Sequence, residues 1–177
     1  MFLRRALVAA AALALVLTGC TPAEEGPLTL TSPDLDASGH LPDWATATVG
    51  GNCRGANTSP TLRWWGVPAG TKSFAVQMTH PQRPEFDHWI VTGLPGDLRE
   101  LPSAPLGEIG VGVTGQNFQG PGRYVGVCIP GEEYEYTVFA LDAEIVGDET
   151  TTVADLAELI DGHVLESAAL RVLRAEG

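Results

Sequence analysis

Between residues 28 and 144, apolar and polar positions alternate in short runs separated by glycine, proline, asparagine and aspartate. A period of two residues predicts strands with one buried side, and the turn residues mark where each strand ends. Many short strands in succession are typical of an antiparallel sandwich or barrel. We predict strands over residues 28–32, 44–49, 61–67, 73–80, 88–94, 123–129 and 134–142.

The spacing of apolar residues changes after residue 148. Within 153–160 they recur every 3.6 residues, which predicts a helix. Thr152 precedes this helix and Asp155 follows three residues later, as in a capping box. Gly162 is expected to end the helix, and a second short helix over 164–168 is expected before a closing strand. The pattern therefore predicts a mainly β domain with short C-terminal helices.

The N-terminal residues have the pattern of an export signal. Arg4 and Arg5 precede 12 apolar residues, and the run ends in Leu-Thr-Gly-Cys at Cys20. The run is too short for a transmembrane helix, which needs about 20 apolar residues. Its ending resembles the bacterial lipobox, which predicts cleavage before Cys20 and lipidation of that cysteine. A plain signal peptide cut elsewhere is the alternative. The predicted organisation is a signal peptide over 1–19, a lipidated flexible tether over 20–27 and one domain over 28–177, on the extracytoplasmic side of the cell membrane.

The charge of the chain limits its partners. The 177 residues include 10 basic and 22 acidic side chains, a formal net charge of −12. Cleavage before Cys20 would remove two arginines and leave 158 residues, about one domain, with a formal charge of −14. This charge argues against nucleic acid and against electrostatic binding to anionic lipid. We therefore expect the membrane connection to be the acyl chains at Cys20.

Two further cysteines, Cys53 and Cys128, remain after cleavage. In an exported protein such a pair favours a disulfide, and two buried thiols are the alternative. Neither cysteine belongs to a Cys-x-x-Cys motif, which argues against a zinc-ribbon or redox role.

Two histidines flank a proline-rich segment, HPQRPEFDH, between two predicted strands. Alternation in 73–80 places His80 on the same inward face as Phe74, Val76 and Met78. A buried polar ring must be hydrogen-bonded or line a cavity. His88 opens the next strand, and a hairpin-like return would bring it near His80. The long glycine-rich segment from 112 to 122 is a second candidate for a functional loop.

Several motifs occur in a fixed order along the chain: LTSPDL, CRGANTSPTLRWWGVPAGTKSFAV, DHWIVTGLP, GQNFQGPGRYVGVCIPG, YEYTVFALD and GHVLESAAL. Together they resemble the phosphatidylethanolamine-binding protein (PEBP) family, in its bacterial Raf-kinase-inhibitor-like branch. The resemblance covers residues 28–173. It implies a sandwich of antiparallel sheets with short C-terminal helices, in agreement with the pattern of apolar positions.

The resemblance also implies a small pocket for anions or lipid head groups at one end of the sandwich. Three family segments correspond to 80–84, 126–130 and 132–134, and the family's strand-leading histidine corresponds to His88. Both acidic positions of the first segment are replaced, and Glu132 stands where the family has a histidine, so the pocket chemistry is altered. The candidate ligand-binding residues are His80, Gln82, His88, Gly126, Cys128, Pro130, Glu132 and Tyr134.

Two structural expectations follow from the same resemblance. The bond between Arg83 and Pro84 corresponds to one expected to be cis in the family. Cys53 and Cys128 lie in segments that border the family pocket, which makes a disulfide between them geometrically plausible.

The function predicted from the sequence is a membrane-anchored extracytoplasmic binding protein, not an enzyme and without a cofactor. Its predicted partner is a small anion or a phospholipid head group. One alternative is a surface interaction or inhibitor module with an unknown protein partner. Another is a metal-dependent enzyme that uses His80, His88 and Glu132 as a two-histidine, one-carboxylate set. His40 and His163 are expected to be structural.

Overall fold

The computed structural model describes residues 26–48 and 53–174. The predicted signal peptide, Cys20 and most of the predicted tether lie outside the described residues. The elements are β1 (Thr29–Thr31), β2 (His40–Leu41), the 3₁₀ helix η1 (Asp43–Ala45), β3 (Thr58–Ser59), β4 (Leu62–Trp65), β5 (Ser73–Thr79), β6 (Trp89–Pro95), β7 (Glu100–Leu101), β8 (Ala104–Pro105), β9 (Val113–Thr114), β10 (Gln116–Asn117), β11 (Gly120–Pro121), β12 (Glu133–Leu141), α1 (Val153–Leu159) and β13 (Val164–Arg174).

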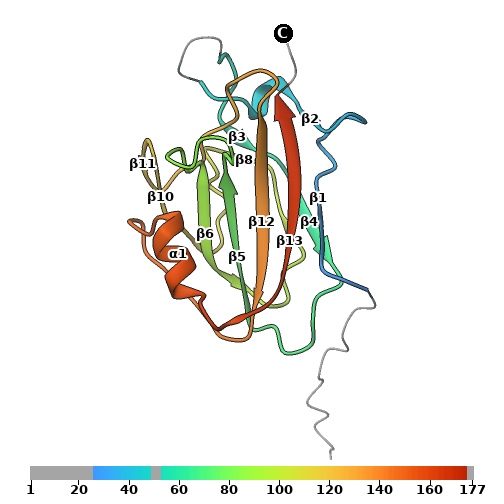
Figure 1. Ribbon diagram of the computed structural model, residues 1–177, viewed down its shortest axis with the longest axis vertical. Coiled ribbons are helices and arrows are strands. Elements are labelled where there is room, and N and C mark those ends of the chain that lie inside the picture. The colour runs from blue at the N-terminus through green and yellow to red at the C-terminus, as the bar shows by residue number, and fades with distance from the viewer. Residues whose placement is uncertain (1–25, 49–52, 175–177) are drawn as a thin grey trace, which may run out of the picture.

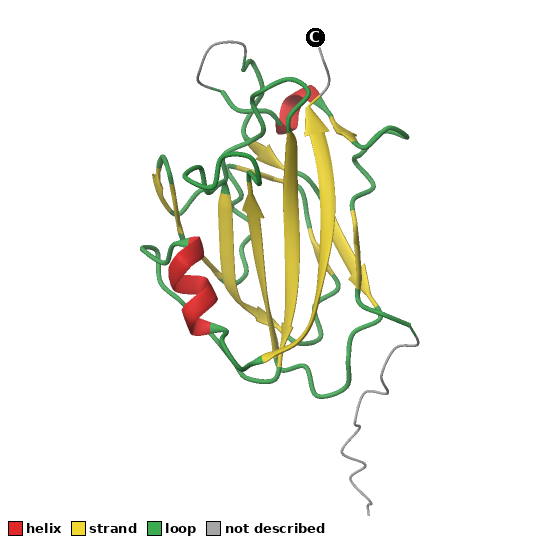
Figure 2. Ribbon diagram, in the orientation of Figure 1, coloured by secondary structure: helices red, strands yellow, loops and turns green. Residues whose placement is uncertain are grey.

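A six-stranded sheet forms the body of the domain, in the order β2-β13-β12-β5-β6-β9 (Figure 1). Its pairs are antiparallel except for β13 with β2. A three-stranded sheet, β1-β4-β7, packs against one of its faces. Figure 2 shows how little helix accompanies these strands. The predicted mainly β sandwich is therefore confirmed.

The core lies between the two sheets, and the alternation in β5 shows how the sequence builds it. Phe74, Val76 and Met78 are fully buried in the main apolar cluster, whereas Ala75 points to a second cluster beneath α1. Burial of each large apolar side chain contributes roughly 1.5–3 kcal/mol. Both faces of β5 are therefore covered at the centre of the sheet, which explains why most residues of this strand are buried.

Helix α1 begins as its sequence predicts, and most of its predicted apolar face is buried, although Leu159 is exposed. The Thr152 hydroxyl accepts a hydrogen bond from the amide of Asp155, and the Asp155 carboxylate accepts one from the amide of Thr152. Leu156 and Ile160 bury themselves in the cluster beneath the helix. Within the two described ranges, no helix is long and apolar enough to cross a membrane.

The second helix predicted over 164–168 is wrong, because these residues open the 11-residue strand β13. β13 pairs with β12 along its length, from Leu141 with Val164 to Glu133 with Leu173. A long ladder satisfies every other backbone group of β13, which outweighs a weak local helical preference.

Two predicted strands are also wrong. Residues 43–45 form η1, and the described part of 44–49 makes only an isolated bridge, between Thr46 and Val127. The segment 123–129 forms no strand, because its amides donate to acceptors on several different elements rather than to one ladder. These bonds fix 123–129 as an ordered loop.

The predicted disulfide between Cys53 and Cys128 is confirmed, with 5.3 Å between the two Cα atoms. It closes a loop of 75 residues. The expectation of a cis bond before Pro84 is wrong, since every peptide bond in the described ranges is trans.

Candidate ligand-binding site

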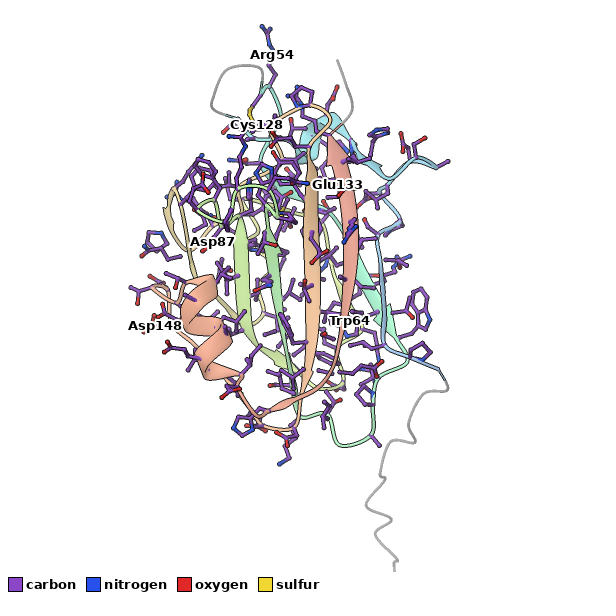
Figure 3. All side chains as sticks on the ribbon, viewed as in Figure 1. Arg54, Trp64, Asp87, Cys128, Glu133 and Asp148 are labelled. Atoms are coloured by element: carbon purple, nitrogen blue, oxygen red, sulfur yellow. A yellow bond between two sulfur atoms is a disulfide. The ribbon has the colours of Figure 1, made fainter. Side chains whose placement is uncertain are left out.

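Three strands of the six-stranded sheet have one of their ends at the same end of the domain. β5 ends there, and β6 and β12 begin there, because neighbouring antiparallel strands run in opposite directions (Figure 1). Figure 3 shows Cys128 and Glu133 at this end, with Asp87 nearby. Loops that leave these strands can therefore converge, although they are far apart in the sequence.

His80 and His88 lie together at this end of the sheet. Both are buried, with 1% and 4% of their surface exposed, and their ring centroids are 6.1 Å apart. The ring of Tyr134 stacks on His80 at 4.3 Å and meets His88 edge-on at 5.0 Å. The inward position of His80, predicted from strand alternation, and its proximity to His88, predicted from a hairpin-like return, are confirmed.

A pocket of about 380 Å³ opens beside these rings, and we call it the histidine pocket. Phe118 contributes an aromatic wall, with its ring centroid 5.1 Å from Phe86 and 5.4 Å from His88. Most of the lining is aromatic or aliphatic. The lining residues are His80, Phe86, His88, Phe118, Gln119, Cys128, Ile129 and Tyr134.

His88 is held in one tautomer. Its Nδ1 lies 2.8 Å from the carbonyl oxygen of Val125, and since a carbonyl only accepts, Nδ1 carries the hydrogen. Burial lowers the pKa of His88 to about 4, against the opposing effect of hydrogen bonding to the Val125 and Gly126 backbone. At neutral pH the ring is therefore uncharged, and Nε2 carries the lone pair that can accept a hydrogen bond.

His80 lies in a triplet with Glu132 and Arg83, of which the carboxylate and the guanidinium are charged. Its Nε2 lies 2.6 Å from Oε2 of Glu132, but without the angle of an aligned hydrogen bond. Arg83 donates two hydrogen bonds to the same carboxylate, at 2.9 and 3.1 Å. Burial lowers the pKa of His80, and the charge of Glu132 partly opposes this. Hydrogen bonds from Arg83 lower the pKa of Glu132, so that carboxylate is charged and paired.

The amides of the 126–130 loop are already used within the protein. The Gly126 amide donates to the side-chain oxygen of Asn57 at 3.0 Å. The amides of Cys128 and Ile129 both donate to the hydroxyl of Tyr134 at 3.1 Å. This loop therefore does not present the row of free amides that an anion site requires.

The structure brings some of the predicted site residues together and separates others. His80, His88, Cys128 and Tyr134 line the histidine pocket, and Glu132 contacts the outer edge of His80. Gln82 and Pro130 are exposed and do not line it, and Gly126 is buried behind it.

Four lining residues were not predicted. Phe118 and Gln119 lie in the glycine-rich segment that the sequence marked as a functional loop, so this signal was present without a residue assignment. Ile129 lies in 126–130, a segment that the family resemblance assigned to the pocket without naming this residue. Phe86 carries no signal of its own, because a lone apolar residue in a loop does not show which way it faces.

The alternative metal set of His80, His88 and Glu132 does not form. Arg83 donates to both carboxylate oxygens of Glu132, the one carboxylate of the set. No three histidine, cysteine or acidic side chains in the described part of the chain converge as metal ligands would. His40 and His163 pair with Asp36 and Asp142 at the surface, as expected of structural histidines.

Known proteins resemble this chain in sequence and in fold. The phosphatidylethanolamine-binding protein family model matches residues 22–175. The UPF0098 protein YbcL of Escherichia coli is 33% identical over 138 residues, which cover 68% of this chain and 73% of YbcL. The crystal structure of E. coli YbcL, described as a new member of the mammalian PEBP family, matches with a TM-score of 0.74 and 28% identity, over 86% of this chain and 100% of that chain. The "Putative lipoprotein LppC" of Mycobacterium tuberculosis is 34% identical over 128 residues, 68% of this chain and 58% of LppC.

Proposed function

Since this chain belongs to the phosphatidylethanolamine-binding protein family, we propose that it is a non-enzymatic binding protein, anchored by lipid at Cys20 on the extracytoplasmic side of the membrane, that holds a small ligand in the histidine pocket. The observation that carries this proposal is the convergence of His80, His88 and Tyr134 around a pocket of about 380 Å³. A pocket of this size, largely apolar with a few placed polar groups, has the character of a small-molecule site.

The side chains of the pocket support binding rather than catalysis. Cys128, the one thiol position in the lining, is part of a disulfide. The hydroxyl of Tyr134 already accepts two amide hydrogens, and His88 is fixed by a neutral carbonyl rather than by a carboxylate. An activated nucleophile needs an adjacent general base that is itself oriented, and these contacts do not supply that arrangement.

The direction in which the chain enters the domain supports an outward-facing pocket. The amide of Leu28 donates to Glu166, which pairs with Ala140 near the end of β12, whereas the pocket lies at the start of β12 (Figure 1). The eight residues from 20 to 27 span at most about 28 Å, and nine-residue β12 alone is about 30 Å long. An anchored domain would thus hold its pocket away from the bilayer, which favours a soluble ligand over a lipid still in the membrane.

Two experiments test the two halves of this proposal. Lipidation is tested by labelling with palmitate and by fractionation, where Cys20→Ala is expected to abolish the label and release the protein from membranes. Binding is tested by ¹H–¹⁵N chemical-shift mapping of the domain with phenol, phenyl phosphate, phosphoethanolamine and inorganic phosphate. Shifts centred on His88, Phe118 and Tyr134 with at least one probe are expected. Absence of shifts with all four would contradict the binding function.

The alternative of a protein-interaction module receives no specific support from the described surface. Large exposed apolar side chains such as Trp65, Leu159 and Leu165 come from three different elements, and single exposed side chains of this kind are ordinary.

A further inference from the structure

The histidine pocket departs from a phosphate site in each of the features that such a site needs. Anion sites use cationic side chains, free backbone amides or both. Here the amides of Gly126, Cys128 and Ile129 are taken by Asn57 and Tyr134.

Arg83, a cation beside the pocket, is likewise already engaged by a carboxylate. Arg83 makes two hydrogen bonds to Glu132, and the carboxylate of Glu132 lies 2.6 Å from Nε2 of His80. A phosphate placed against His80 would therefore lie beside an ion pair that is already formed, and would gain no unpaired cation there. Burial keeps the pKa of both histidines below their usual range, so neither ring supplies a compensating charge at neutral pH.

What the pocket does offer is a set of ring faces with two polar groups, the ring of His88 and the side-chain amide of Gln119. Phe86, Phe118 and Tyr134 provide aromatic surface, and Ile129 adds an aliphatic contact. Aromatic groups pack edge-on or offset at the 5–6 Å separations found among these rings. His88 gives its hydrogen to Val125 and so presents Nε2 as an acceptor.

We propose that the histidine pocket selects an uncharged aromatic ring carrying one hydrogen-bond donor, which it directs to Nε2 of His88, and that it rejects phosphate and carboxylate groups. This inference rests on the binding function proposed above and names the ligand class of that same pocket. Phe118, which is 43% exposed, stands at the edge of the pocket as an aromatic wall for such a ring.

Three matched ligands test this proposal at pH 7 by chemical-shift titration of the domain. Phenol has the ring and the donor, anisole has the ring without the donor, and phenyl phosphate has the ring with an anion. Phenol is expected to bind about 3- to 10-fold more tightly than anisole, since one net hydrogen bond is lost. It is expected to bind at least about 10-fold more tightly than phenyl phosphate, because the phosphate loses hydration without gaining a partner.

Variants then assign the preference to particular side chains. His88→Phe keeps a ring but removes the acceptor, and it should equalise phenol and anisole. Phe118→Ala changes a half-exposed side chain, where misfolding is not expected, and should weaken both ligands together. His163→Phe replaces a surface histidine away from the pocket and should leave all affinities unchanged.

The outcomes separate this inference from the proposed function. Phenyl phosphate binding as tightly as phenol would overturn the ligand class and leave the binding function standing. Phenol shifts that lie outside the pocket, or that persist unchanged in both pocket variants, would also overturn the ligand class. Failure of every aromatic and phosphate probe to bind would overturn both.

Discussion

His88 illustrates at the scale of one residue how burial decides chemistry. A histidine with an exposed ring would be partly charged near neutrality, but this ring is buried and hydrogen-bonded to a carbonyl. Its pKa falls from 6.5 to about 4 in the folded protein. Between these two values the unfolded chain binds a proton that the folded protein does not, so stability falls as the pH falls through this window.

We predict that His88 contributes about 3 kcal/mol to the loss of stability between pH 7 and pH 4. Urea unfolding at both pH values should show that His88→Phe loses less stability on acidification than the native protein by about this amount. His163→Phe is the matched control and should keep the native pH dependence. Equal losses in the native protein and His88→Phe would contradict the prediction.

Glu132 and Arg83 act on His80 with opposite signs. The charge of Glu132 raises the pKa of His80, whereas the charge of Arg83 lowers it. We therefore expect Glu132→Gln to lower the His80 pKa further and Arg83→Met to raise it. Titration of the His80 ring by NMR measures both changes, and shifts of the same sign in the two variants would argue against the triplet described above. Because Arg83 is largely exposed, stability should change by no more than about 1 kcal/mol in Arg83→Met.

At the scale of elements, the 123–129 loop is fixed by contacts with the segment around η1. Gly126 has no room for a side chain, since a Cβ atom there would lie 2.2 Å from the carbonyl oxygen of Ala45 and 2.6 Å from the carbonyl carbon of Thr46. Both are backbone atoms, which cannot move aside as a flexible side chain can. A larger residue at this position would therefore force the loop and η1 apart.

We predict that Gly126→Ala destabilises the domain by about 2–3 kcal/mol, in the range of overpacked cores. Gly122→Ala is a useful comparison in the same part of the chain. Gly122 has φ +69° with open space around it, so alanine there should cost only about 1 kcal/mol of left-handed strain. Urea unfolding measures both, and similar values for the two variants would show that the close approach at Gly126 does not matter.

At the scale of the whole molecule, the disulfide joins two distant parts of the chain at the end that carries the pocket. Cys128 lines the pocket, and Cys53 lies 75 residues earlier. Constraining a loop of this length stabilises the folded state by about 4 kcal/mol in the chain-entropy model.

We predict that the double variant Cys53→Ser, Cys128→Ser loses up to about 4 kcal/mol of stability, measured by urea unfolding. A reducing agent should produce a loss of similar size in the native protein and none in the double variant. A loss below 1 kcal/mol in both measurements would contradict this account of the bond.

The local sequence pattern predicted the structure correctly where the interactions that decide it lie within one short segment. The period of two in 73–80 predicted the buried face of β5 and the inward turn of His80, and the residues at 152 and 155 predicted the start of α1. The pattern failed at 123–129 and 164–168. In the first, hydrogen bonds go to partners scattered over the fold, and in the second, β12 provides a complete partner strand.

The sequence by itself determined the mainly β sandwich, the helix start and two histidines at the ends of neighbouring strands, because alternation, capping and turn residues act over a few neighbours. The tertiary structure alone decided that Phe86 and Phe118 wall the pocket, that the 126–130 amides are occupied, and that Arg83 neutralises Glu132. These facts depend on contacts between segments that are tens of residues apart in the sequence. The charge and shape of the pocket depend on several segments together, so the pattern of any one segment does not reveal them.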